Sequence, residues 1–134
     1  MPEVSNLSGT APLVCVSDVK ASLAFYTNAL NFEQVIINDK AGYALVRRGN
    51  LLIAMIQTDD KPALVATATN VAAQLWMDDV AGYWDSIKGH ANEYPSIGIT
   101  GPVDRDYGVR ELHIKDPDGF LMFFTDTNDL KKGN

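Results

Sequence analysis

The chain has 134 residues, of which 46% are hydrophobic and 21% charged, and its formal net charge is −6 at pH 7. The apolar content excludes a disordered chain, and the single cysteine, Cys15, excludes a disulfide framework or a Cys-based zinc module. An acidic domain without a Lys/Arg stripe repels phosphates, so we expect no nucleic-acid partner. The longest apolar run, 51–56, is far shorter than the roughly 20 residues of a membrane span, so we expect a cytoplasmic protein with no membrane partner.

The first half of the chain predicts one helix among four strands. After a loose polar arm at 1–10, a short apolar run at 13–16 predicts a strand, and Ser17-Asp18 offers an N-cap. Apolar residues then follow in steps of four, three and four, as on one face of an α-helix: Val19, Leu23, Tyr26 and Leu30. Asn31 stands where that helix is expected to stop. Strand-like stretches with glycine between them follow at about 32–38, 43–48 and 51–57.

The same order of elements returns 61 residues later. Residues 58–70 are predicted to be a linker, and a strand is predicted at 71–77. When Asp79 is set on Asp18, the apolar face of the first helix falls on Val80, Trp84, Ile87 and Ala91. A Gly/Pro-rich stretch at 94–108 reads as a loop. Strands are then predicted near 109–115 and 120–126, joined by Asp116-Pro117-Asp118-Gly119, which suits a type I turn.

This repeat predicts an α+β fold of two tandem βαβββ units. The units are expected at 11–57 and 71–126, followed by a polar tail at 127–134. A four-stranded sheet with one helix has only one face covered, so the other face must find a partner in the second unit or in another chain. Duplicated open sheets that face each other make a lined cavity.

Four segments in order resemble the vicinal-oxygen-chelate superfamily of glyoxalases, bleomycin-resistance proteins and extradiol dioxygenases. The first helix of that superfamily resembles VSDVKASLAFYTNALNF (16–32), and its closing hairpin resembles KDPDGFLMFF (115–124). The segments most similar to bleomycin-resistance proteins are AGYALVRRGNLLIAMI (41–56) and LWMDDVAGYW (75–84). The resemblance implies that 1–134 form a single domain with the glyoxalase/bleomycin resistance fold, whose mixed, curved sheets carry the helices on the outer face.

The resemblance also locates the positions where metal-dependent relatives hold their ion. In those relatives His or Gln lies seven residues before the helix-opening Asp of each unit, and a further ligand lies on each fourth strand. Those positions here are Ala11, Ala72, Ala54 and Phe123, whose side chains have no lone pair to donate. We therefore expect no metal and no other cofactor, and no metal-dependent isomerase, dioxygenase or fosfomycin-transferase chemistry.

Strand alternation predicts what else shares the concave face with these positions. Gln74 and Trp76 follow Ala72 at steps of two, while His113 pairs with Phe123 across the last hairpin and Glu111 faces the same way. Apolar side chains complete the face: Leu13, Cys15, Leu52, Ile56 and Leu121. The opposite faces are predicted to lie under the helices, and they carry Val14, Val16, Leu75, Met77, Met122 and Phe124. An apolar, aromatic face with a few polar groups suits a flat or amphipathic organic ligand.

Bleomycin-resistance proteins hold their drug in a groove between two subunits, lined by aromatic and acidic groups. Tyr43 and Tyr107 occupy positions where some of these proteins carry Trp, and Trp76 matches a Trp of the cavity in others. The resemblance therefore implies a homodimer, with or without exchange of N-terminal strands, that sequesters a small aromatic or cationic molecule. The candidate ligand-binding residues are Tyr43, Gln74, Trp76, Tyr107, Arg110, Glu111, His113 and Phe123.

Several of these residues have a second interpretation. His113 fits a half-buried histidine with one hydrogen bond as well as a ligand contact, and Arg110 with Glu111 fits a surface charge pair. The sequence leaves open whether the protein is an enzyme. The alternative function is a glyoxalase-related lyase or isomerase that works without metal, with His113 or Glu111 as acid or base. A non-catalytic subunit or regulatory domain is the third possibility.

Overall fold

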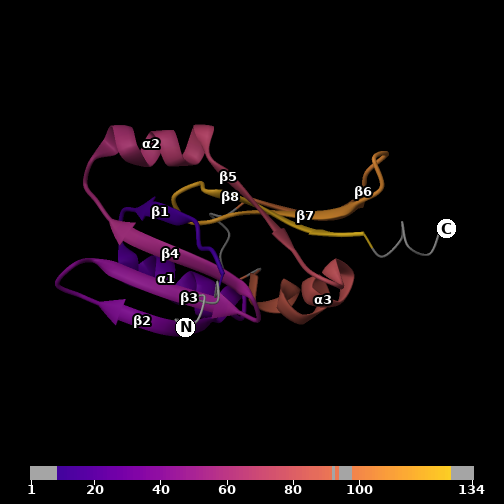
Figure 1. Cartoon of the computed structure of the whole chain (residues 1–134), viewed down its shortest axis with the longest axis horizontal. Coiled ribbons are helices and arrows are strands. Elements are labelled where there is room, and N and C mark those ends of the chain that lie inside the picture. The colour runs from indigo at the N-terminus through magenta and orange to yellow at the C-terminus, as the bar shows by residue number, and fades with distance from the viewer. Residues whose placement is uncertain (1–8, 92, 94–97, 128–134) are drawn as a thin grey trace, which may run out of the picture.

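The computed structural model describes residues 9–91, 93 and 98–127, and it contains two four-stranded sheets (Figure 1). The first sheet has the order β1-β4-β3-β2 and is built from β1 (Leu13–Val16), β2 (Glu33–Asn38), β3 (Tyr43–Arg48) and β4 (Leu51–Gln57). The second has the order β5-β8-β7-β6 and is built from β5 (Ala72–Trp76), β6 (Ile99–Asp104), β7 (Arg110–Lys115) and β8 (Leu121–Asp126). In each sheet the first strand lies parallel to the fourth and the other pairs are antiparallel, so the mixed α+β architecture predicted from the repeat is confirmed.

One helix covers a face of each sheet. The helix α1 (Val19–Ala24) continues into a π-helical segment, η1 (Phe25–Ala29), and it packs on β3 and β4. The helix α3 (Val80–Ala91) packs on β6, β7 and β8 and also contacts η1, so the two units meet through their helices. Asn31 has a positive φ of 60°, as expected for a residue that ends a helix. No helix in the described part of the chain is long and apolar enough to span a membrane.

Both helices begin against the end of a fourth strand. The Gln57 side chain, at the end of β4, accepts a hydrogen bond of 2.9 Å from the backbone N–H of Val19. The Asp126 side chain, at the end of β8, accepts one of 2.6 Å from the backbone N–H of Val80. Each contact satisfies one of the N–H groups that the first turn of a helix leaves without a partner. The sequence repeat is therefore also a repeat in tertiary contacts.

The two units share one hydrophobic core. The sheet faces under the helices are apolar as predicted, since Val14, Val16, Leu75, Met122 and Phe124 are buried and Met77 packs against them. Two buried tyrosines connect the units through hydrogen bonds of their hydroxyl groups. The Tyr26 hydroxyl donates to Asp116 over 2.9 Å, and the Tyr83 hydroxyl donates to the Leu30 carbonyl over 2.7 Å. These bonds remove the cost of burying two phenol groups and fix one unit on the other.

The structure differs from the prediction in the segment between the units. Residues 58–70, expected to be an irregular linker, contain a third helix, α2 (Lys61–Asn70). Its N-cap is Asp60, whose side chain accepts a hydrogen bond from Ala63 N–H, and Pro62 suits the first turn. None of its residues is buried, so the sequence shows no apolar periodicity there.

The second difference is β6, which lies inside the Gly/Pro-rich stretch expected to be a loop. Pro102 falls where the β6–β7 register shifts between Thr100 and Val103. Proline has no N–H to donate and is tolerated at such an irregularity on an edge strand. The remaining parts of this stretch at 94–97, and most of the predicted arm and tail at 1–8 and 128–134, lie outside the described residues.

Candidate functional site

The second sheet brings predicted site residues into two neighbouring rows. Gln74 on β5 pairs with Phe123 on β8, which pairs in turn with His113 on β7. The next row runs from Trp76 through Thr125 to Glu111. Since residues two apart on a strand share a face, all of these side chains belong to the face opposite the helix.

A cavity of about 460 Å³ lies on this face. Five of its lining residues were predicted as ligand contacts: Gln74, Tyr107, Glu111, His113 and Phe123. The other lining residues are Ala72, Ala73 and Arg105. Ala72 and Phe123 are two of the four positions where metal-dependent relatives carry a ligand, so the cavity occupies the region that the sequence indicated.

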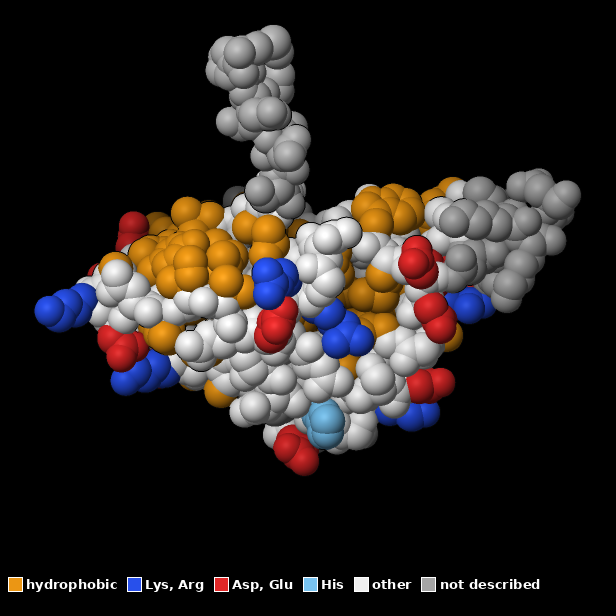
Figure 2. All heavy atoms as spheres, turned by 60° about the horizontal axis from the view of Figure 1, so that its bottom comes forward, with side chains coloured by type: hydrophobic (Ala, Val, Ile, Leu, Met, Phe, Trp, Pro, Cys, Tyr) orange, Lys and Arg blue, Asp and Glu red, His pale blue; other side chains and the backbone are white. Residues whose placement is uncertain are grey.

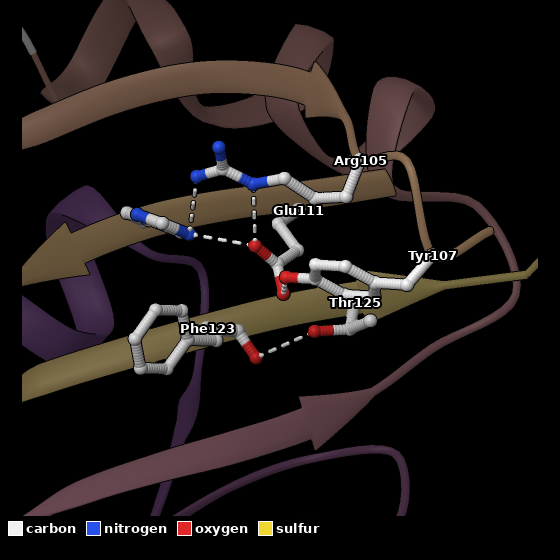
Figure 3. A network of polar contacts seen from close by, with 6 residues as sticks. Arg105, Tyr107, Glu111, Phe123 and Thr125 are labelled. Carbon is white, nitrogen blue, oxygen red and sulfur yellow. Dashed lines mark hydrogen bonds and ion pairs between the residues drawn. The ribbon is translucent and has the colours of Figure 1, made fainter. Parts of the chain in front are cut away.

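A network of polar contacts around Glu111 forms one wall of the cavity (Figure 3). Arg105 Nε donates to Glu111 Oε1 over 2.8 Å, and the Tyr107 hydroxyl donates to Oε2 over 2.9 Å. His113 Nε2 lies 3.1 Å from Glu111 Oε1 and 3.5 Å from Arg105 Nη2. The Glu111 side chain is only 7% exposed, so its charge is enclosed by these three partners.

The contacts of His113 determine its tautomer. Nε2 cannot both donate to Glu111 and accept from Arg105. The contact with Glu111 is shorter, so we assign the hydrogen to Nε2 and leave Nδ1 for other partners. The imidazole stands edge-on to the Phe123 ring, with 4.4 Å between the ring centres and 84° between the planes. This arrangement fixes the ring from two sides.

Glu111 is held in its ionised form. Burial raises the pKa of its carboxyl, but hydrogen bonds from His113, Arg105 and Tyr107 together outweigh burial, and the pKa lies below its ordinary value. Conversely, the hydrogen bond to Glu111 raises the pKa of the Tyr107 hydroxyl. A carboxylate with a lowered pKa and three donors is a poor proton acceptor at neutral pH, so this geometry suits a residue that orients its neighbours.

Three predicted ligand contacts lie outside this cavity. Arg110 pairs with Asp104 on β6 over 2.7 Å, and its hydrogen bond is the main cause that holds the pKa of Asp104 below its usual range. Trp76 is 52% exposed and borders a separate depression with Arg48, Leu51 and Asp78 among its lining residues. Tyr43 is half-buried on β3 of the other sheet. The roles predicted for these residues remain predictions.

Arg105 is the site residue that sequence reasoning missed. It follows β6 in the Gly/Pro-rich stretch, where no periodicity assigns a direction to a side chain. Its link to Glu111 depends on the turn that returns the chain from β6 to β7, in which Arg105 N–H donates to the Val109 carbonyl over 2.8 Å. Among the described residues, no three His, Cys, Asp or Glu side chains are grouped so that they could hold a metal ion.

The chain combines a fold of two βαβββ units with a cavity on an open sheet face, and its sequence matches a known family. The model of the Glyoxalase/Bleomycin resistance protein/Dioxygenase superfamily matches residues 10–124. The chain therefore belongs to this superfamily, as the ordered motifs predicted. A comparison with curated protein sequences gives no match.

Solved structures with the same fold include three proteins that concern bleomycin. A bleomycin-binding protein complexed with bleomycin is 26% identical, with 87% of this chain and 96% of that chain covered and a TM-score of 0.72. A bleomycin resistance determinant encoded on the transposon Tn5 is 25% identical, with 88% and 96% covered and a TM-score of 0.69. The bleomycin-binding protein from bleomycin-producing Streptomyces verticillus, complexed with copper(II)-bleomycin, is 24% identical, with 92% and 98% covered and a TM-score of 0.72. Small-molecule binding thus occurs within this family.

Proposed function

We propose that the protein is a metal-independent binding protein that sequesters a small aromatic molecule in the cavity of its second sheet. The observation that carries this proposal is the cavity of about 460 Å³, in which Phe123 and Tyr107 supply flat rings beside a satisfied polar network. Its size falls in the range of small-molecule sites, and apolar walls with a few placed polar groups are typical of them. The solved relatives in complex with bleomycin support the same class of function.

The proposal is tested by calorimetric titration of the full-length protein with bleomycin and with simple naphthalene derivatives. We expect saturable one-site binding of at least one of these compounds, which Phe123→Ala weakens about tenfold or more through the loss of an aromatic face. Val65→Ala serves as the control, because Val65 lies on α2, is 59% exposed and is not among the residues that line the cavity. Absence of any binding heat with every compound would contradict the proposal.

The proposal includes a homodimer in which the concave face of the first sheet meets the ligand-binding face of a second copy. That first face is mainly apolar, with Leu45, Leu52 and Ile56 half-buried and Leu13 63% exposed, and it also carries the ion pair of Arg47 with Glu33. Hydrophobic side chains form a broad patch over the first sheet (Figure 2), and β2 adds the exposed Val35, Ile36 and Ile37. Exposed apolar surface of this kind marks interaction sites. In the described chain β1 pairs with its own β4, so this dimer needs no exchange of strands.

The dimer is tested with a matched pair of charged substitutions. Leu13→Glu places a carboxylate on the proposed interface, whereas Val65→Glu places one on α2, where Val65 is 59% exposed. We expect native mass spectrometry and sedimentation to show a dimer for the unaltered protein and Val65→Glu, and a monomer for Leu13→Glu. A monomeric unaltered protein, or a dimer that Leu13→Glu leaves intact, would contradict this part of the proposal.

A second function, a metal-free lyase or isomerase, is favoured by one observation. His113 and Glu111 lie 3.1 Å apart in the cavity, and Nδ1 of His113 is left for a substrate by the tautomer assigned above. Turnover of a 2-oxoaldehyde adduct that His113→Ala abolishes and Val65→Ala preserves would support it. The lowered pKa of Glu111 makes His113 the acid or base in this alternative.

A further inference from the structure

The charge that the cavity presents to a ligand differs from the charge of the whole chain. The formal net charge is −6, yet Glu111, the one acid among the described residues that line the cavity, is enclosed, with 7% of its side chain exposed. Its ion-pair partner Arg105 lines the same cavity with 36% of its side chain exposed. The charged group that a ligand in the cavity can contact directly is therefore the guanidinium of Arg105.

The donors of Arg105 are only partly used. Nε donates to Glu111 and Nη2 lies 3.5 Å from His113, while Nη1 has no hydrogen-bond partner within the part of the chain that the structure describes. Figure 3 shows the guanidinium above Glu111, with this third nitrogen pointing away from the carboxylate. A guanidinium whose plane is fixed by a carboxylate loses little freedom when it receives a second acceptor.

The rest of the lining complements this positive group. Gln74, exposed on β5, adds an amide donor one strand beyond Phe123. Phe123 on β8 and the neighbours of Gln74 on β5, Ala72 and Ala73, provide the apolar part of the lining. No carboxylate other than Glu111 lines the cavity among the described residues, so nothing described there would pair with a cation.

We propose that the ligand of this cavity is an aromatic anion, an aryl carboxylate, whose carboxylate is bound by Arg105 and whose ring lies on the Phe123 surface. This inference rests on the proposed function. It specifies a negatively charged aromatic ligand, whereas the sequence led us to expect an aromatic or cationic one. The chain's net negative charge opposes it only weakly, because charges beyond the Debye length of roughly 8–10 Å are screened at physiological salt. Arg105 acts within contact distance and forms charge-assisted hydrogen bonds.

Three probes that share the naphthalene ring system and differ in charge test the proposal directly. They are 2-naphthoate, the neutral 2-naphthylmethanol and the cationic 2-naphthylmethylammonium, titrated calorimetrically into the full-length protein at neutral pH. Since a hydrogen bond to a charged group is the stronger kind, we expect the naphthoate to bind about tenfold or more tighter than the alcohol, and the ammonium to bind most weakly. If the alcohol or the ammonium binds as tightly as the naphthoate, the inference fails while the proposed function stands. If none of the three binds and bleomycin does not bind either, both fail.

A matched pair of variants assigns the preference to Arg105. Arg105→Gln should remove the preference for the naphthoate and leave the affinity for the alcohol within about twofold, because the ring contact with Phe123 is retained. Lys88→Gln makes the same change of net charge at an exposed lysine that pairs with Asp85 on α3, away from both concave faces, and it should leave the preference unchanged. Equal loss in both variants would indicate a long-range charge effect and overturn the assignment. The probe series on the unaltered protein decides the question even if Arg105→Gln folds poorly.

Discussion

On the concave faces of the two sheets, equivalent positions in the strand pairing carry side chains of different chemistry. Leu45 and His113 occupy equivalent steps of the hairpins β3–β4 and β7–β8, and Tyr43 and Glu111 occupy the step two residues earlier. The first unit thus places an aliphatic and an aromatic side chain where the second unit places an imidazole and a carboxylate. Among the described residues, the network around Glu111 has no counterpart in the first unit.

The faces under the helices differ much less. Equivalent positions there carry fully buried apolar residues in both units, namely Ala44 and Leu112, Val46 and Ile114, and Met55 and Phe124. Folding therefore constrains one face of each sheet, because that face must fill the space against a helix at high density. The other face is free to differ, and this freedom lets one unit hold a polar site while its duplicate offers an apolar surface.

The largest expected effect is a loss of stability that distinguishes the two faces of β8. Phe124 is fully buried and its ring centre lies 5.1 Å from that of Tyr83, so Phe124→Ala should lower the free energy of unfolding by about 3–5 kcal/mol. The adjacent Phe123 is half-buried on the cavity side, and Phe123→Ala should cost clearly less stability while weakening ligand binding. Urea unfolding of both variants measures the difference. Equal losses of stability would contradict the division of the sheet into a structural and a binding face.

The next effect concerns Asp116, the carboxylate that joins the second unit to Tyr26 of the first. Burial raises the pKa of Asp116 from 3.8 to about 6, although the Phe120 N–H, the Tyr26 hydroxyl and the Asp118 N–H all donate to it. The folded protein therefore binds this proton more tightly than the unfolded chain does. The contribution of Asp116 to the free energy of unfolding is about 3 kcal/mol. It is fully present below about pH 4 and is lost as the pH rises through about 6.

Asp116→Asn tests this effect, because the amide is nearly isosteric and does not titrate. We expect urea denaturation between pH 4 and 7 to show that this variant has lost the decline in stability that the unaltered protein shows. Asp59→Asn, at an exposed position between β4 and α2, is the control and should retain the decline. A decline of equal size in Asp116→Asn would show that another group causes it.

A smaller effect is expected from Glu111, which accepts from three partners. Glu111→Gln keeps one acceptor oxygen and turns the other into a donor that faces Tyr107 or Arg105. We expect a loss of about 1–3 kcal/mol in the free energy of unfolding, since buried donors are left without an acceptor. Glu33→Gln removes the same charge from an exposed pair with Arg47 and should cost less than about 1 kcal/mol. If the two variants lose equal stability, the network is a surface ion pair rather than an organised wall of the cavity.

Most elements that the sequence predicted have one buried face; the exception is β2, which was predicted as a strand although all of its residues are exposed. The helix at 19–30, the helix that α3 forms and the strands that became β3, β4, β7 and β8 all have an apolar period, and the structure contains each of them. The helix α2 was missed because it buries no residue, and β6 was missed because Gly101 and Pro102 interrupt it. In these two segments local chemistry and pairing with a neighbour decide the structure, and neither leaves a periodic signal.

The candidate site was predictable to a similar extent. Alternation along β5, β7 and β8 placed Gln74, Glu111, His113 and Phe123 on one face, and the structure brings them together around one cavity. Arg105 was not predictable, because a loop residue gains its position from the turn that carries it. The charge of the site was also hidden, since net charge says nothing about which carboxylate is enclosed and which guanidinium is exposed.

The central claim is that the small molecule binds on the second sheet and not on its duplicate. Amide and imidazole NMR spectra of the ¹⁵N-labelled protein, recorded during titration with 2-naphthoate, test this claim most directly. We predict the largest chemical-shift changes at the His113 ring and along β7 and β8, with the Arg105 side chain following the same saturation curve. Changes centred on Tyr43 and Leu45, with His113 unmoved, would contradict the account.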